Sequence, residues 1–141
     1  MKTDFRVFVD SDVVISSLLS KTGAAYLLIH STRVISILSQ YSVLEIKSVC
    51  ERLKINIKQA NAIISNCQQM TISPSLKNVR TQYKDYTLDI NDAHIIVGAV
   101  AAKVTFLATY NMRHYKTEKI KRDFGITILT PAVFLQYMRS K

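Results

Sequence analysis

The sequence predicts an α/β domain, in the form of a three-layer α/β/α sandwich with a mostly parallel central sheet. Short apolar runs with the length of buried strands alternate along the chain with longer segments of helical character. This alternation is typical of a parallel sheet that helices cover on both faces. The chain contains only 3 glycines and 2 prolines, which favours regular elements over long loops. Its 141 residues show no repeat, linker or low-complexity stretch, so we expect one domain over residues 1–141.

In the first half of the chain, β-branched and aromatic runs predict strands, and capping residues predict helices. The run RVFV at residues 6–9 predicts the first strand, and Ser11 or Asp12 behind it can cap the helix that follows. Ser42 and Glu45 have the spacing of a capping box, which predicts that a helix begins at Ser42. The other elements expected in this half are helices at residues 24–30, 42–53 and 58–67 and strands at residues 34–38 and 70–72.

The second half continues the alternation after a polar segment, residues 76–86, to which the sequence assigns no structure. A helix is expected over residues 92–103, where alanine and glycine positions allow close packing against a sheet. Gly125 is a C-cap that ends a helix over residues 116–124, and Pro131 suits the first position of a final helix. The strands expected in this half are residues 105–108 and 126–129.

The composition favours a polyanionic partner. Lys and Arg number 19 against 10 Asp and Glu, which gives a net charge of +9 and favours nucleic acid ahead of an acidic membrane surface. Cys50 and Cys67 cannot form a disulfide framework or a zinc motif, so we expect two small core residues. No stretch has the length of a membrane span or the pattern of a signal peptide, so we expect a cytoplasmic protein with no membrane partner.

Acidic residues fall where ligands bind in open α/β sheets, beyond the carboxyl ends of the strands. Asp10 ends the first strand, Glu45 lies in the first turn of the helix after the second strand, and Asp92 opens the helix before the fourth strand. Three carboxylates at one sheet edge would repel one another unless a cation lay between them. Hard oxygen ligands select Mg²⁺ or Mn²⁺, which can clamp a phosphate and activate water for phosphodiester hydrolysis.

These acids also have purely structural interpretations. Glu45 can complete the capping box, and Asp92 lies near a helix N-terminus, where a negative charge is favourable without any metal. Asp12 can be a helix cap and Asp89 a loop acid. Asp10 directly ends a hydrophobic strand, where a carboxylate adds nothing to the core, and this position favours a functional role.

Four segments in order resemble the PIN-domain family, metal-dependent nucleases that include the VapC-type toxins of prokaryotic toxin–antitoxin pairs. The first has an apolar strand followed by an acid, and the last has the form of an apolar strand end followed by T-x-D/N-x-x-x-F. The four segments are residues 7–19, 42–45, 89–99 and 106–115. Their order and spacing span essentially the whole chain, and the resemblance is strongest to small prokaryotic members described as toxin components.

The resemblance makes Asp10, Glu45 and Asp92 the catalytic and metal-binding acids, with Mg²⁺ or Mn²⁺ as the metal. Asn111 stands where many members have a fourth catalytic acid, and Asp12 stands where the family usually has Asn. The activity implied is that of an endoribonuclease acting on single-stranded RNA, with a small antitoxin protein as partner and a homodimer as a common assembly.

Further residues are expected to support this chemistry. Thr109 and Asn111 would orient phosphate or water, with Asp12 and Asp89 as additional acids near the site. His114 lies just beyond the fourth strand and near the site, whereas His94 is expected on the helix surface or in packing. The basic residues expected to neutralise the RNA backbone are Arg113, Lys116, Lys119, Lys121 and Arg122. The alternative for these basic residues is an ordinary solvated helix face.

Two other functions remain open from the sequence. The absence of the fourth acid at Asn111 is compatible with a catalytically weak or inactive PIN-fold module that binds RNA or a protein. Residues 10–14 also fit the DxDx[TV] start of haloacid-dehalogenase-type phosphatases, in which Asp10 would be the nucleophile and Asp12 the acid/base. That family needs a strand before its later acids, and no strong strand precedes Asp89 and Asp92.

Overall fold

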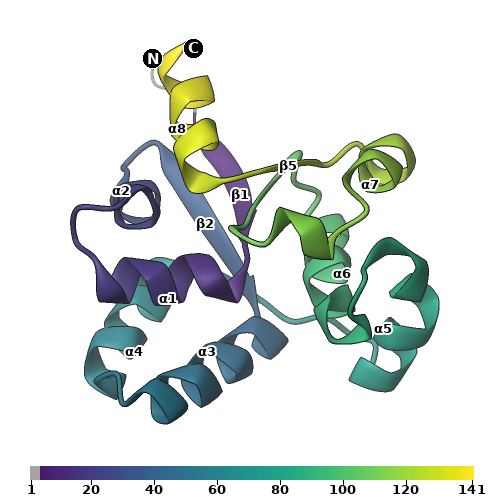
Figure 1. Ribbon diagram of the computed structural model, residues 1–141, viewed down its shortest axis with the longest axis horizontal. Helices are drawn as coiled ribbons and strands as arrows, with labels where there is room; N and C mark the ends of the chain where they lie inside the picture. The colour runs from purple at the N-terminus through teal and green to yellow at the C-terminus, as the bar shows by residue number, and fades with distance from the viewer. Residues whose placement is uncertain (1–3) are drawn as a thin grey trace.

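The computed structural model describes residues 4–141, with a five-stranded sheet at their centre (Figure 1). The strands are β1 (Phe5–Val9), β2 (Val34–Ser39), β3 (Gln68–Met70), β4 (Phe106–Ala108) and β5 (Thr127–Leu129). They lie in the order β3-β2-β1-β4-β5, and all four pairings are parallel. The predicted α/β class with a mostly parallel sheet is confirmed, and no pairing between these strands is antiparallel.

Side chains of β1 enter two separate cores, because successive residues of a strand point to opposite faces of the sheet. Val7 and Val9 pack on one face and Phe8 on the other. The first face is covered by α1 (Ser11–Leu19), α2 (Ala24–His30), α3 (Gln40–Leu53), α4 (Ile57–Asn66) and α8 (Pro131–Arg139). The second is covered by α6 (Ala93–Ala101) and α7 (Thr117–Phe124), with α5 (Leu76–Tyr83) packed against α6. Figure 1 shows the two groups of helices on either side of β1 and β2, as the predicted three-layer arrangement requires.

The strand order places a topological switch point between β1 and β4. The chain adds β2 and β3 on one side of β1, and then β4 and β5 on the other. Asp10 follows β1 and donates its backbone N–H to Ala108 O at 2.9 Å, while Thr109 follows β4 and donates to Leu129 O at 3.0 Å. The first residues beyond these two strands therefore lie at the carboxyl edge of the sheet, where α/β proteins bind ligands.

The helix α6 approaches the sheet closely at Gly98, as its small residues predict. A Cβ atom at this position would overlap the ring of Phe8. We expect Gly98→Ala to lower the free energy of unfolding by about 1–3 kcal/mol through overpacking, although alanine is the better helix former. Urea denaturation measures this loss, with Gly23→Ala as the control because its new Cβ meets nothing closer than Ser20 Oγ at 3.5 Å. An equal or smaller loss at Gly98 than at Gly23 would contradict the prediction.

The predicted capping box at Ser42 is wrong. The helix α3 begins two residues earlier, at Gln40, because the Ser39 hydroxyl accepts a hydrogen bond from Ser42 N at 3.2 Å and caps the helix. Glu45 therefore lies in the second turn rather than the first. Its carboxylate makes no capping bond, and the structural interpretation of this acid fails.

The first helix is also capped one residue earlier than predicted. Asp10, rather than Ser11 or Asp12, is the N-cap of α1, and its carboxylate accepts a hydrogen bond from Ser11 N at 2.7 Å. The helix begins at Ser11 itself. Asp10 thus combines the end of β1 with the start of α1, and this double role fixes the position of its side chain.

The strand β3 lies two residues before its predicted place at residues 70–72. It is an edge strand in which Gln68 and Gln69 are exposed, so its sequence lacks an apolar run. Ile72 is held instead by the Gln40 side chain, which donates to Ile72 O at 2.7 Å and accepts from Ile72 N at 2.8 Å. The unassigned residues 76–86 form α5 and a short 3-10 helix, Lys84–Tyr86. The other elements begin and end within two residues of prediction.

The remaining predictions about the chain concern cysteines and membranes. Cys50 and Cys67 are free and buried, as expected for small core residues. No single helix among residues 4–141 is long and apolar enough to cross a membrane. The helices α1 and α2 reach that length only together, with a bend of 105° between them, and both contribute to the core.

Candidate active site

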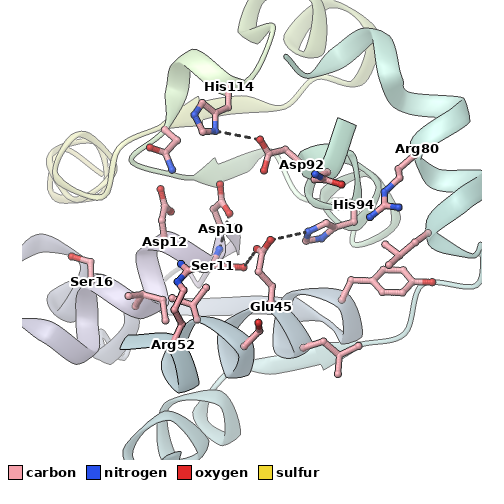
Figure 2. A pocket seen from close by; sticks show the side chains of 18 of the residues that line it. Asp10, Ser11, Asp12, Ser16, Glu45, Arg52, Arg80, Asp92, His94 and His114 are labelled. Carbon is pink, nitrogen blue, oxygen red and sulfur yellow. Dashed lines mark hydrogen bonds and ion pairs between the residues drawn. The ribbon is translucent and has the colours of Figure 1, made fainter. Parts of the chain in front are cut away.

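A pocket of about 860 Å³ opens at the switch point of the sheet. Its walls bring together the predicted residues Asp10, Asp12, Glu45, Asp92 and Asn111, which come from four separate places in the chain. Figure 2 shows the four carboxylates facing one another across this pocket. The volume lies within the range of small-molecule and cofactor sites in proteins.

Asp10 is the most buried of these acids, with 6% of its surface exposed. Its Oδ2 accepts hydrogen bonds from Thr109 Oγ1 at 2.9 Å and from Tyr115 Oη at 2.6 Å. Burial raises the pKa of Asp10 and the nearby charge of Glu45 adds to this rise, while the hydrogen bonds from Tyr115, Thr109 and Ser11 oppose it. Asp10 is therefore rigidly held, and its ionised form is disfavoured unless a positive charge is near.

Tyr115 is a contact of Asp10 that the sequence interpretation missed. Burial and the charge of Asp10 raise the pKa of Tyr115, so its hydroxyl stays protonated and donates a hydrogen bond to the carboxylate. The backbone at Tyr115 also pairs with Thr87 in an isolated antiparallel bridge. The available signal was the aromatic residue that ends the fourth family segment, but no sequence pattern reports where a hydroxyl points.

Asp12 lies in the first turn of α1, beside Asp10. Its Oδ2 accepts hydrogen bonds from Tyr110 N at 3.0 Å and Thr109 Oγ1 at 3.4 Å. Its Oδ1 is buried and has no hydrogen-bond partner among residues 4–141. Burial and then repulsion from Asp10 raise the pKa of Asp12 to about 7. The Asp12 carboxylate is therefore held in place by two hydrogen bonds, and its ionised form is disfavoured.

Glu45 faces the pocket from α3 and is paired on both sides. Ser11 Oγ donates to its Oε1, and His94 Nε2 lies 3.6 Å from its Oε2. Burial raises the pKa of Glu45, but the hydrogen bonds from His94 and Ser11 and the charge of His94 outweigh it, so the pKa is lowered. Glu45 is thus the acid in the cluster whose ionised form the protein favours. His94 is buried on α6, as its predicted packing role requires, but its pairing with Glu45 was not predicted.

Asp92 approaches the other acids from the opposite wall. It ends a short 3-10 helix, Ile90–Asp92, and is the N-cap of α6, as the predicted position near a helix N-terminus requires, but its side chain makes no capping hydrogen bond. Burial and the charge of Asp10 raise the pKa of Asp92 to about 6, against the influence of His114. His114 Nδ1 lies 3.2 Å from Asp92 Oδ2, which confirms the predicted nearness of this histidine to the site.

The other predicted residues divide between the pocket and the surface around it. Thr109 is buried against Asp10, and Asn111 lines the pocket while its backbone N donates to Thr109 Oγ1 at 3.0 Å. Asp89 does not line the pocket, because its carboxylate accepts from Asn91 N at 2.9 Å and caps the short 3-10 helix. The structure therefore favours the loop-acid interpretation of Asp89.

The predicted RNA-binding residues do not reach the pocket. None of Arg113, Lys116 and Lys119 lines it, and Lys119 Nζ lies 4.6 Å from the centre of the Tyr86 ring. The basic residues that do line it are Arg52 on α3 and Arg80 on α5, which the sequence interpretation missed. Arg52 follows Glu45 by seven residues on the same helix, so helical periodicity was an available signal. Arg80 lies in the polar segment 76–86, to which the sequence assigns no structure, so no sequence signal pointed to this residue.

The donor set fits a hard divalent cation such as Mg²⁺ or Mn²⁺. Four carboxylates converge, and Asp12 Oδ1 is buried without a hydrogen-bond partner in the part of the chain that the structure describes, while Asp92 Oδ2 is buried with only the His114 contact at 3.2 Å. Their present rotamers bring no three His, Cys, Asp or Glu side chains of residues 4–141 into metal-binding geometry. Binding would therefore involve adjustment of side chains, for which the exposed mouth of the pocket leaves room.

Comparison with known proteins identifies the family. The sequence profile of the PIN domain matches residues 6–113. The chain belongs to the PIN domain family. The matched range contains all four pocket acids together with Thr109 and Asn111, so the resemblance noted in the sequence is confirmed. None of the curated protein sequences compared matches this PIN protein.

Solved structures share the fold of this PIN protein at low sequence identity. VapBC2 from Rickettsia felis, bound to a DNA fragment from its promoter, matches with 14% identity and a TM-score of 0.61, over 89% of this chain and 98% of that chain. VapBC-1 from nontypeable Haemophilus influenzae matches with 10% identity and a TM-score of 0.63, over 91% and 99%. VapC20 from Mycobacterium tuberculosis, a Sarcin-Ricin loop cleaving toxin, matches with 12% identity and a TM-score of 0.54, over 86% and 98%.

Proposed function

We propose that this PIN protein is a metal-dependent endoribonuclease that hydrolyses phosphodiester bonds of RNA. The observation that carries the proposal is the meeting of Asp10, Asp12, Glu45 and Asp92 in one pocket at the switch point of the sheet. Burial and mutual repulsion raise the pKa of three of these acids. A protein gains no stability from such an arrangement, whereas a hydrolytic site that holds a cation needs it.

Asp10, Glu45 and Asp92 are the residues that would hold Mg²⁺ or Mn²⁺, with Asp12 beside them. A divalent cation at these oxygens would polarise the phosphodiester and lower the pKa of a water molecule. Thr109 and Tyr115 fix the Asp10 carboxylate through two hydrogen bonds. The amide of Asn111 would orient a phosphate oxygen or a water from the pocket wall.

The pairing of acids with histidines gives each wall of the pocket a different role. His94 favours the ionised form of Glu45, which suits a permanent ligand or a group that accepts a hydrogen bond from water. His114 Nδ1 lies 3.2 Å from Asp92 Oδ2, and about half of this histidine side chain is exposed to solvent. The charge of Asp92 therefore depends on its neighbours, and that of Glu45 is set by the fold.

We further propose that the protein is the toxin component of a toxin–antitoxin pair. Solved structures that share its fold include the VapBC complexes and VapC20, the Sarcin-Ricin loop cleaving toxin, and they match over most of the chain. A small antitoxin is the partner this role requires. The net charge of +9 supports RNA as the substrate, because a basic protein attracts the phosphate backbone.

Metal removal tests the hydrolytic proposal. We expect an end-labelled single-stranded RNA and a circular RNA to be cut in Mg²⁺ or Mn²⁺ but not in EDTA, with activity restored when metal is added back. Cutting of the circle shows endonucleolytic action. Equal cleavage in EDTA, or none with either metal, would contradict the proposal. A chromogenic phosphomonoester should stay intact, and its hydrolysis would instead support the phosphatase alternative for Asp10.

A non-catalytic module that binds RNA or a protein is the second candidate. Asn111 in place of the fourth acid favours it, because an amide supplies no negative charge to a second cation. This candidate predicts RNA retention in a filter-binding assay without any cleavage in Mg²⁺ or Mn²⁺. The two candidates are therefore separated by the same metal series.

A further inference from the structure

We infer that Arg52 and Arg80 hold phosphates of the RNA on two sides of the acid cluster, so that the strand crosses the pocket between α3 and α5. The inference rests on the proposed ribonuclease function and specifies how its substrate is held. It replaces the path along α7 that the basic residues of the sequence suggest. It also gives the residues a role in positioning the substrate rather than in the hydrolytic step.

Arg52 and Arg80 are basic residues in a pocket that also holds four carboxylates. Neither forms an ion pair with an acid within residues 4–141. The Arg80 Nε is buried and has no hydrogen-bond partner in that range. A buried donor without an acceptor carries a free-energy cost, which an incoming anion at this position would remove.

The two arginines approach the acids from different elements. Arg52 lies in the last turn of α3, the helix that carries Glu45, and Arg80 lies on α5, which packs against α6. Figure 2 shows them on opposite sides of the pocket, with Glu45 and His94 between them and Asp10 and Asp92 above. A strand with its scissile phosphodiester at the acids must continue in both directions, which brings its flanking phosphates towards these two positions.

The chemistry of guanidinium suits this role. Its planar fork of N–H donors matches two phosphate oxygens, keeps its charge at all physiological pH values and is weakly hydrated. The basic side chains of α7 are less available to bind a phosphate in the pocket, since Lys119 lies over the Tyr86 ring and Arg122 Nε is 3.0 Å from Asp123 Oδ1. The charges available to a ligand in the pocket are therefore those of Arg52 and Arg80.

The same forks would also bind carboxylates of an acidic protein segment. RNA is favoured because a polynucleotide carries phosphates at regular intervals on both sides of the bond that reacts. Two separated guanidinium groups flanking the acid cluster match such a ligand.

The test compares two double variants that each remove two positive charges. Binding of a short fluorescent single-stranded RNA is measured by anisotropy in EDTA, over a series of salt concentrations, for wild type, Arg52→Gln/Arg80→Gln and Lys116→Gln/Lys119→Gln. We expect the arginine variant to bind at least about tenfold more weakly, with a salt slope reduced by about 1.4. The lysine variant should lose at most about threefold.

Further arms separate the outcomes. Arg80→Lys keeps the charge but not the fork, and should lie between wild type and the double variant. Equal losses of RNA affinity in the two double variants, or unchanged RNA binding in the arginine variant, would overturn the inference. The ribonuclease proposal would stand in that case if metal-dependent cleavage were observed in the separate cleavage assay. Binding of polyglutamate, rather than RNA, that depends on the arginines would assign them to an acidic protein. A wild type that binds no RNA in EDTA would overturn the inference, and the absence of cleavage with either metal would overturn the ribonuclease proposal. Thermal melting verifies that each variant is folded.

Discussion

Asp10→Asn is expected to lower the rate of RNA cleavage by at least about a thousandfold, which corresponds to about 4 kcal/mol of transition-state stabilisation. The substitution removes the carboxylate that ends β1 and lies among the other acids, while it preserves the size of the side chain. An amide oxygen is a weak ligand for a hard cation. The loss should appear in the rate constant of cleavage in a single-turnover assay with saturating protein.

The fold should accommodate this substitution. The amide oxygen of asparagine can still accept from Ser11 N, while its NH₂ faces the hydroxyls of Thr109 and Tyr115. Hydroxyls can turn from donor to acceptor, so both contacts can be kept. Asp85→Asn is the matched control, because it changes the same charge on an exposed side chain outside the pocket. Cleavage by Asp10→Asn at more than about a tenth of the wild-type rate would exclude Asp10 as a metal ligand.

Asp12→Asn is expected to raise the free energy of unfolding by about 2–4 kcal/mol at pH 8 in EDTA. The pKa of Asp12 is raised from 3.8 to about 7, so the folded protein holds a proton that the unfolded chain releases. A carboxyl of this kind favours folding below pH 4 and loses that contribution as the pH rises through 7. Asparagine removes the charge while its amide oxygen still accepts from Tyr110 N.

The raised pKa of Asp12 also predicts how the free energy of unfolding changes with pH. In EDTA, wild-type stability should fall between about pH 4 and pH 7, with Asp92 contributing in the same direction because its pKa is raised to about 6. Asp12→Asn should flatten this fall, and Asp85→Asn should leave it unchanged. Urea denaturation at a series of pH values measures both. Stability that rises over this range, or a destabilised Asp12→Asn, would show that the acids are not strained by burial and repulsion. Mg²⁺ should stabilise the wild type more than Asp12→Asn.

The convergence of the acids could be predicted because it follows from topology. Asp10 ends an apolar run too short for a helix, and parallel strands bring such residues to one edge whatever the details of packing. The order of the segments then places Glu45 and Asp92 at the same edge. These inferences need only the alternation of elements, so an error of two residues in the start of α3 did not affect them.

The contacts that tune the acids could not be predicted in the same way. The helix α5 buries only Val79, so its sequence shows no apolar periodicity. Because the helix was not predicted, the position of Arg80 in the pocket was not predicted either. The pairs Glu45–His94 and Asp92–His114 join side chains from different elements, and they depend on rotamers rather than spacing. Arg52 is the exception, since its position two turns after Glu45 was readable from the helix.

The antiparallel bridge between Thr87 and Tyr115 closes residues 87–115 into a ring, which the Tyr115 hydroxyl fastens to Asp10. Asp92 and Asn111 both lie inside this ring. An insertion or deletion within it would therefore shift one site residue against another, whereas the largely exposed connection from α1 to α2, residues 20–23, lies outside the ring and should tolerate such changes. We therefore expect segments outside residues 87–115 to tolerate insertions and deletions better than segments inside, because the Thr87–Tyr115 bridge fixes the length of chain between the site residues.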